Sequence, residues 1–117
     1  MVLILFIVFN IIAMFAYPGS TYRNNLSPGY SFTQNFLSDL GRTVSFSGEV
    51  NFFSAQFFNM SLILAGGVFS FFYFHVWKVF LADNQRMLAQ IGSIFGVLGG
   101  LSLVGVGITP ADLYLEL

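Results

Sequence analysis

The sequence has no cysteine and very little charge. Without a thiol, the chain has no disulfide, no thiolate nucleophile, no cysteine-ligated metal cluster and no lipoprotein anchor. Only 8% of its 117 residues are charged, against about 25% in a typical soluble domain. Four basic residues and a net charge of −1 provide no patch that would follow a phosphate backbone, so we expect no nucleic-acid partner.

What the chain has instead is apolar and aromatic side chains, at 56% and 19% of its residues. A chain of this length is too small to hide that much apolar surface in one core. The lipid bilayer is therefore the expected solvent and the first expected partner. We predict an all-α fold, a polytopic transmembrane helical bundle that forms a single domain.

Three apolar runs predict membrane-spanning helices at about 1–17, 51–80 and 88–108. The first run is near the short limit for a span. It has no preceding basic region and no small-residue cleavage site, so we favour a retained helix over a signal peptide. The second run ends in residues typical of a membrane interface: Tyr73, His75, Trp77 and Lys78.

The loop after the first run contains one helical signature. Ser31 and Gln34 have the spacing of a capping box, and apolar residues follow on one face until Gly41. This pattern predicts a short amphipathic helix at about 32–40. It would lie at the membrane interface or fold back onto the bundle.

Several polar residues are predicted to lie on the same side of the membrane, in the loop, at the start of the second span and at the end of the chain. They form a candidate polar pocket that would bind an ion, a lipid headgroup or a small substrate. The alternative is that they cap helices and hold them together. The set is Asn35, Asp39, Arg42, Gln56, Asn59 and Asp112.

Glycines recur on the predicted spans, and they are candidates for close helix packing. Gly92, Gly96 and Gly100 have a four-residue spacing, Gly99 adjoins them, and Gly66 lies in a polar, small-residue stripe of the second span. So many glycines lower helix propensity, which implies that they serve contact. The contact is either internal or with another subunit.

Nothing in the sequence indicates catalysis or a cofactor. His75 is the only histidine, whereas a metal site needs several converging donors. The chain has no nucleophile-elbow, zinc-protease or nucleotide-binding motif. We predict no metal site and no cofactor, and the enzyme interpretation has no positive support.

The few charges bear on orientation. Lys78 and Arg86 flank the predicted polar connection at 82–87, which places that connection in the cytoplasm. Near the end of the chain, residues 109–112 have the pattern of a helix start. Either a short interfacial helix closes the protein, or the chain is the N-terminal part of a longer one.

Residues 35–41, Asn-Phe-Leu-Ser-Asp-Leu-Gly, resemble the N-x-x-S-[DE]-L-G loop signature of a family of prokaryotic multi-spanning membrane proteins, a domain of unknown function. That family also has a phenylalanine–asparagine pair in its next helix, similar to Phe58-Asn59, and a V-G-[IVL]-x-P-x-D stretch, similar to residues 106–112. The resemblance implies a polytopic topology and a prokaryotic inner (cytoplasmic) membrane, and it implies no reaction.

Two functions fit these observations. The first is a non-catalytic subunit that packs against other transmembrane helices, in a larger complex or in a homo-oligomer. The second is a small membrane enzyme or transporter that uses the polar pocket.

Overall fold

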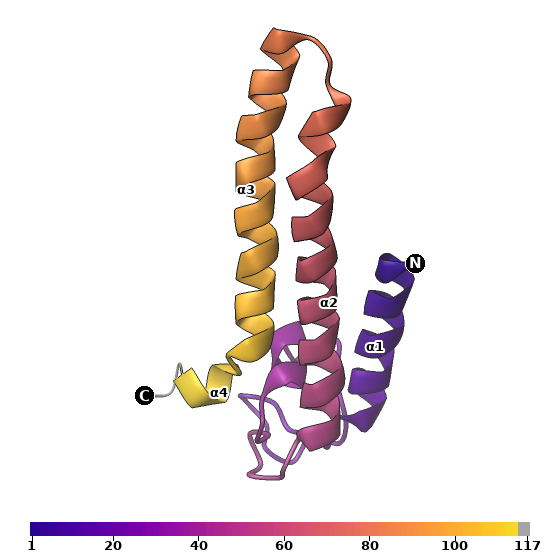
Figure 1. Ribbon diagram of the computed structural model, residues 1–117. Helices are drawn as coiled ribbons and strands as arrows, with labels where there is room; N and C mark the ends of the chain where they lie inside the picture. Colours follow the sequence, from indigo (N-terminus) through magenta and orange to yellow (C-terminus); the bar gives the residue numbers. More distant parts are fainter. Residues whose placement is uncertain (115–117) are drawn as a thin grey trace.

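The computed structural model describes residues 1–114, without the side chains of Ala111 and Tyr114. Its two longest helices, α2 (Phe52–Val76) and α3 (Asp83–Ile108), form an antiparallel hairpin. Helix α1 (Val2–Ala16) packs on the side of α2 away from α3 (Figure 1). A long loop and the short α4 (Ala111–Tyr114) lie at one end of the hairpin, here called the loop end. The far end holds η2 (Trp77–Val79) and residues 80–82.

Two helices are long and apolar enough to cross a membrane, and both exceed the roughly 30 Å of a hydrocarbon core. They are Phe52–Val79, with 28 residues, and Asp83–Ile108, with 26. Only 28% and 17% of their most apolar windows are buried, whereas the core helix of a soluble protein would be mostly covered. The outward apolar surface therefore requires lipid or protein around it.

The all-helical prediction is confirmed for residues 1–114, and its second and third spans match α2 with η2 and α3. The first predicted span is not shown. Helix α1 is apolar but has only 15 residues, or about 22 Å at 1.5 Å per residue. It ends where Tyr17 turns extended and Gly19 adopts a φ of +119°. A Cβ at Gly19 would lie 2.5 Å from the Ser27 carbonyl oxygen, so glycine is required there.

The predicted amphipathic helix at 32–40 is wrong in type and bounds. The structure has a turn followed by a 3₁₀ helix, η1 (Leu37–Gly41). The Ser31–Gln34 capping box is replaced by a bond from the Ser31 N–H to Asn35 Oδ1, at 3.0 Å. Asparagine and aspartate side chains compete with the helical ladder for backbone groups, and here they prevail.

The polar connection between the long helices is shorter than the predicted 82–87. Helix α3 begins at Asp83, and the Arg86 N–H already donates to the Ala82 carbonyl at 2.8 Å. An acidic residue in a first helical turn is favoured by the helix dipole. The polar residues after Ala82 thus form the first turn of α3 rather than a loop.

The hydrophobic core is small and lies toward the loop end. Leu40 of η1 is fully buried among α1 and α2 residues, and the cluster around it contains Ala13, Tyr17, Phe58 and Leu62. Along the rest of the hairpin, large apolar side chains point outward. The core therefore holds the loop against the helices. Most of the apolar surface of the helices lies outside this core and faces outward.

Candidate functional site

Asp39 is a buried carboxylate that organises the loop. Its Oδ2 accepts hydrogen bonds from the Phe36 N–H at 2.9 Å and from Asn35 Nδ2 at 3.0 Å. Asn35 Nδ2 also donates to the Ser20 carbonyl at 2.9 Å. Both side chains are more than nine-tenths buried. This pair joins two segments of the loop, Ser20 and residues 35–39, so its polar atoms are used to hold the loop together.

The residues after Asp39 are bound to α2 through their carbonyl groups. The Leu40 carbonyl accepts from Ser54 Oγ at 3.1 Å and from Asn51 Nδ2 at 3.2 Å. The Gly41 carbonyl accepts from Asn59 Nδ2 at 3.3 Å. A Cβ at Gly41 would lie 2.6 Å from the Phe58 ring. The approach of Gly41 to α2 therefore requires glycine and brings its carbonyl within reach of Asn59.

Asp112, in α4, binds the loop from the other end of the chain. Its carboxylate accepts from the Thr43 N–H at 2.9 Å, from Thr43 Oγ1 at 2.5 Å and from the Val44 N–H at 3.0 Å. Partial burial acts to raise the pKa of Asp112, but these hydrogen bonds outweigh it and lower the pKa below its ordinary value. The charged form of Asp112 is thus the one that holds α4 against the loop.

Arg42 and Asp112 line one hollow of about 460 Å³. The Arg42 guanidinium lies 4.2 Å above the Phe46 ring, and its Nε donates to the Val44 carbonyl at 3.2 Å. The hollow is the part of the predicted polar pocket in which a cationic and an anionic side chain face the same space.

The six predicted pocket residues thus fall into separate groups. Arg42 and Asp112 share the hollow, whereas Asn35 and Asp39 form a pair inside the loop. Asn59 binds the Gly41 carbonyl, and Gln56 is exposed on α2. The contact between Thr43 and Asp112 could not be predicted from sequence spacing, because the two residues are 69 positions apart.

The predicted packing glycines also divide. A Cβ at Gly66 would overlap the Gly100 carbonyl oxygen, one at Gly100 would overlap Ser70 Oγ, and one at Gly96 would overlap the Tyr73 ring. These three glycines form the α2–α3 seam, so their contact is internal. Gly92 and Gly99 face open space. Neither makes a close contact with the described residues.

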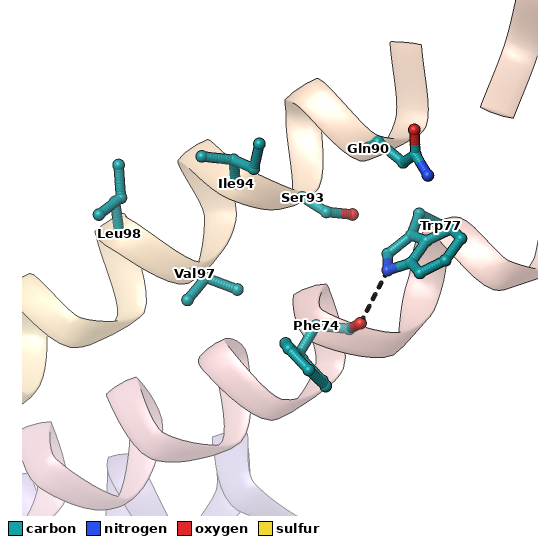
Figure 2. Close-up of a pocket in the computed structure, with 7 residues that line it drawn as sticks. All are labelled: Phe74, Trp77, Gln90, Ser93, Ile94, Val97 and Leu98. Atoms are coloured by element: carbon teal, nitrogen blue, oxygen red, sulfur yellow. Dashed lines mark hydrogen bonds between the residues drawn. The ribbon is translucent and has the colours of Figure 1, made fainter. Parts of the chain in front are cut away.

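A second hollow, here called the far-end groove, lies between the far halves of α2 and α3 and has a volume of about 460 Å³. Figure 2 shows Gln90 and Ser93 of α3 turned toward Phe74 and Trp77. The Trp77 indole N–H donates to the Phe74 carbonyl at 3.0 Å (Figure 2). Ser93 is 5% exposed, and its hydroxyl is unpartnered among the described residues. The groove is lined by Phe74, Trp77, Gln90, Ser93, Ile94, Val97 and Leu98.

Three contacts were not expected from the sequence. Asn10 of α1 donates to Ser61 Oγ of α2 at 3.1 Å. Tyr73, predicted as an interfacial residue, packs against Gly96 of the seam. His75 is exposed, with Nδ1 2.9 Å from the Phe71 carbonyl.

Within residues 1–114, no group of three or more metal-ligating side chains comes together.

Comparison of the chain with protein-family models, with curated proteins and with solved structures finds no match.

Proposed function

We propose that this protein is a non-catalytic subunit of a larger membrane assembly and that α3 carries its contact with a partner helix. One observation carries the proposal: Gly92 and Gly99 face open space on α3. They lie seven residues, about two turns, apart and therefore on one side of the helix.

The argument rests on what glycine costs a helix. Each glycine lowers helix stability by about 1 kcal/mol relative to alanine. At Gly66, Gly96 and Gly100 this is offset by the close approach of α2 and α3. Gly92 and Gly99 have no such compensation within the described chain. In a bilayer, small residues on an outward helix face permit another helix to approach closely.

The polar residues support a structural role for the loop end. Asp39 and Asp112 each accept several hydrogen bonds from the loop, and Asn59 holds Gly41. Carboxylates used in this way are already occupied by structural hydrogen bonds rather than presented to a substrate.

The proposal places α1 in the bilayer beside α2, as a third membrane-embedded helix. Its Asn10 donates to Ser61 of α2 and to the Phe6 carbonyl at 2.7 Å, which satisfies the amide N–H groups away from water. Lys78 and Arg86 favour a cytoplasmic position for residues 80–82. The membrane we propose is a prokaryotic inner membrane, in line with the family resemblance of residues 35–41.

The experiment is isolation of the protein from its native membrane in a mild detergent. We expect a stoichiometric partner or a homo-oligomer. Gly99→Leu should abolish that association, because a bulky side chain blocks close helix approach. Leu101→Phe is the control, since it adds bulk at an exposed position on the opposite side of α3 from Gly92 and Gly99. A monodisperse wild-type monomer would refute the subunit proposal.

A second candidate function is a small membrane enzyme or transporter, and the observation that favours it is the hollow shared by Arg42 and Asp112. A wild-type monomer that retains a small polar molecule, lost in Arg42→Gln, would favour this function. The same variant should leave a subunit assembly intact.

A further inference from the structure

We propose that the far-end groove binds one anionic phospholipid. An acyl chain would lie between α2 and α3, and the phosphate would lie beside Lys78 and Arg86. This inference goes beyond the subunit role, since it needs only the location in a bilayer. It rests on three observations at one place: the charge beside the groove, the order of polar and apolar residues along it, and a buried hydroxyl without a partner.

The charge is provided by two cations on one groove residue. Lys78 Nζ lies 5.9 Å from the centre of the Trp77 ring, and the Arg86 guanidinium carbon lies 5.1 Å from it. In the part of the chain that the structure describes, neither forms an ion pair with a carboxylate. Asp83 is the one acidic residue between them in sequence, which leaves one net positive charge. Basic sites between transmembrane helices attract anionic headgroups.

The polarity of the groove follows the order of a phospholipid. Helix α3 passes from Arg86 through Gln90 and Ser93 to the apolar Ile94 and Val97. Arg86 and Ser93 are seven residues apart, or about 10 Å along the helix. A phospholipid has the same sequence of groups along its length: a charged phosphate, then ester carbonyls, then a hydrocarbon chain.

Ser93 adds an unmet hydrogen-bonding requirement. Serines elsewhere on these helices bond to carbonyl groups: Ser102 Oγ donates to the Leu98 carbonyl at 2.8 Å, and Ser61 Oγ to the Phe58 carbonyl at 2.7 Å. The Ser93 hydroxyl is buried without such a bond. A buried, unpaired hydroxyl is unfavourable. An ester carbonyl in the groove is an acceptor of the type that it lacks.

A lipid fits this groove better than a further apolar helix does. A helix would fill the apolar part, but it would leave Lys78 and Arg86 without an anion. The phosphate of an anionic lipid would lie near both cations, because lysine and arginine side chains extend to the level of the lipid headgroups. The partner helix of the proposed function is instead assigned to the side of α3 that carries Gly92 and Gly99.

The test uses Trp77, which is the only tryptophan in the chain. The full chain is reconstituted in phosphatidylcholine vesicles that contain equal fractions of either brominated-chain phosphatidylglycerol or brominated-chain phosphatidylcholine. Bromine quenches indole fluorescence at short range. We expect the groove to bind the anionic lipid with about fivefold higher affinity than phosphatidylcholine. This is the effect of about 1 kcal/mol that one net positive charge has at a membrane surface.

Two pairs of variants separate the headgroup from the chain. Lys78→Gln with Arg86→Gln should remove the preference, whereas Arg23→Gln, an exposed arginine in the loop, should keep it. Val97→Phe should fill the groove and reduce quenching by the anionic lipid. Leu101→Phe places the same ring at an exposed position on α3 outside the groove and should leave quenching unchanged.

Equal quenching by the two brominated lipids would overturn the proposal, and so would a preference that survives loss of both cations. Weak quenching by both lipids would mean that another helix covers the groove. That result would also overturn lipid binding, yet it would leave the subunit role intact. Conversely, a monomeric protein with the full anionic preference would refute the subunit role alone.

Discussion

The two ends of the α2–α3 hairpin are held by different interactions. At the loop end, Asp39, Asn59 and Asp112 bind backbone groups of the loop. At the far end, cations lie over the Trp77 ring, and the buried Ser93 hydroxyl is unpartnered within the described chain. The loop end is thus held mainly by hydrogen bonds within the chain, although the buried Asn51 Oδ1 has no partner among the described residues. The far end instead has one buried, unpartnered hydroxyl, which lines a groove.

This difference separates structure from recognition. A buried carboxylate that accepts several N–H hydrogen bonds has no unmet hydrogen-bonding capacity. The buried carboxylate of the loop end is therefore a poor candidate for binding a ligand. The far end has few polar groups: the Trp77 indole N–H is bonded to the Phe74 carbonyl, whereas the buried Ser93 hydroxyl has no partner in the described chain. Candidate ligand contacts are therefore found by asking which polar atoms lack partners rather than where polar residues are most frequent.

The strongest test of the comparison is Leu40→Ala at the loop end. Leu40 is fully buried at the centre of the core, and truncation of such a leucine costs about 2–5 kcal/mol. We expect a large fall in the midpoint of SDS-induced unfolding, with faster amide hydrogen exchange throughout residues 17–51. Leu37→Ala, at a leucine that is 45% exposed, is the control and should change little. Similar losses in both variants would show that η1 is not anchored by Leu40.

A smaller loss is expected from Asp39→Ala. The substitution leaves the Phe36 N–H and one of the two Asn35 Nδ2 hydrogens without an acceptor, while the bond from Asn35 to the Ser20 carbonyl remains. A buried unsatisfied group costs about 1–3 kcal/mol. Hydrogen exchange at residues 31–42 should quicken while α3 stays protected. Glu49→Ala removes an exposed acid from the same loop and is expected to be neutral. Equal exchange in the two variants would contradict the role of Asp39.

The attachment of α4 should depend on pH. The folded-state pKa of Asp112 is lowered, so its stabilisation is complete above the ordinary aspartate pKa and is lost as pH falls through the lowered value. The amide resonances of Thr43 and Val44 in detergent micelles should report this transition in the acid range. Asp112→Asn should abolish it, while Asp83→Asn should not. A transition that persists in Asp112→Asn would assign it to another group.

The long helices were predictable because their apolar runs are long. The second span was predicted at 51–80, and the helix long and apolar enough to cross a membrane covers Phe52–Val79. The start of α3 was missed because polar residues such as Asp83 and Arg86 suit either a loop or a first helical turn. The glycines were also predicted to pack closely against other helices, and Gly66, Gly96 and Gly100 do so. Which ones do so depends on the rotation of α3 about its axis, and that is set by contacts such as Tyr73 with Gly96.

The polar loop was less predictable, for a physical reason. Asn35 and Asp39 have a four-residue spacing that fits one face of an α-helix, but their side chains bind backbone groups and stop the helix from forming. The bond between Thr43 and Asp112 joins residues far apart in sequence, and no local spacing encodes it. Only the arrangement of α4 beside the loop brings them together.

The smallest effect, and the most direct comparison of the two ends, comes from two buried serines. Ser54 is fully buried at the loop end and donates to the Leu40 carbonyl at 3.1 Å. Ser93 is buried at the far end without a partner in the described chain.

Ser54→Ala should lower stability by about 1 kcal/mol, the net contribution of a typical hydrogen bond. In lipid-free detergent, Ser93→Ala should be neutral or slightly stabilising, because it removes an unpaired hydroxyl. Adding phosphatidylglycerol should then stabilise the wild type more than Ser93→Ala, since only the wild type can donate to an ester carbonyl. If Ser93→Ala destabilises as much as Ser54→Ala in lipid-free detergent, the Ser93 hydroxyl already has a partner within the protein, and the contrast between the two ends fails at this position.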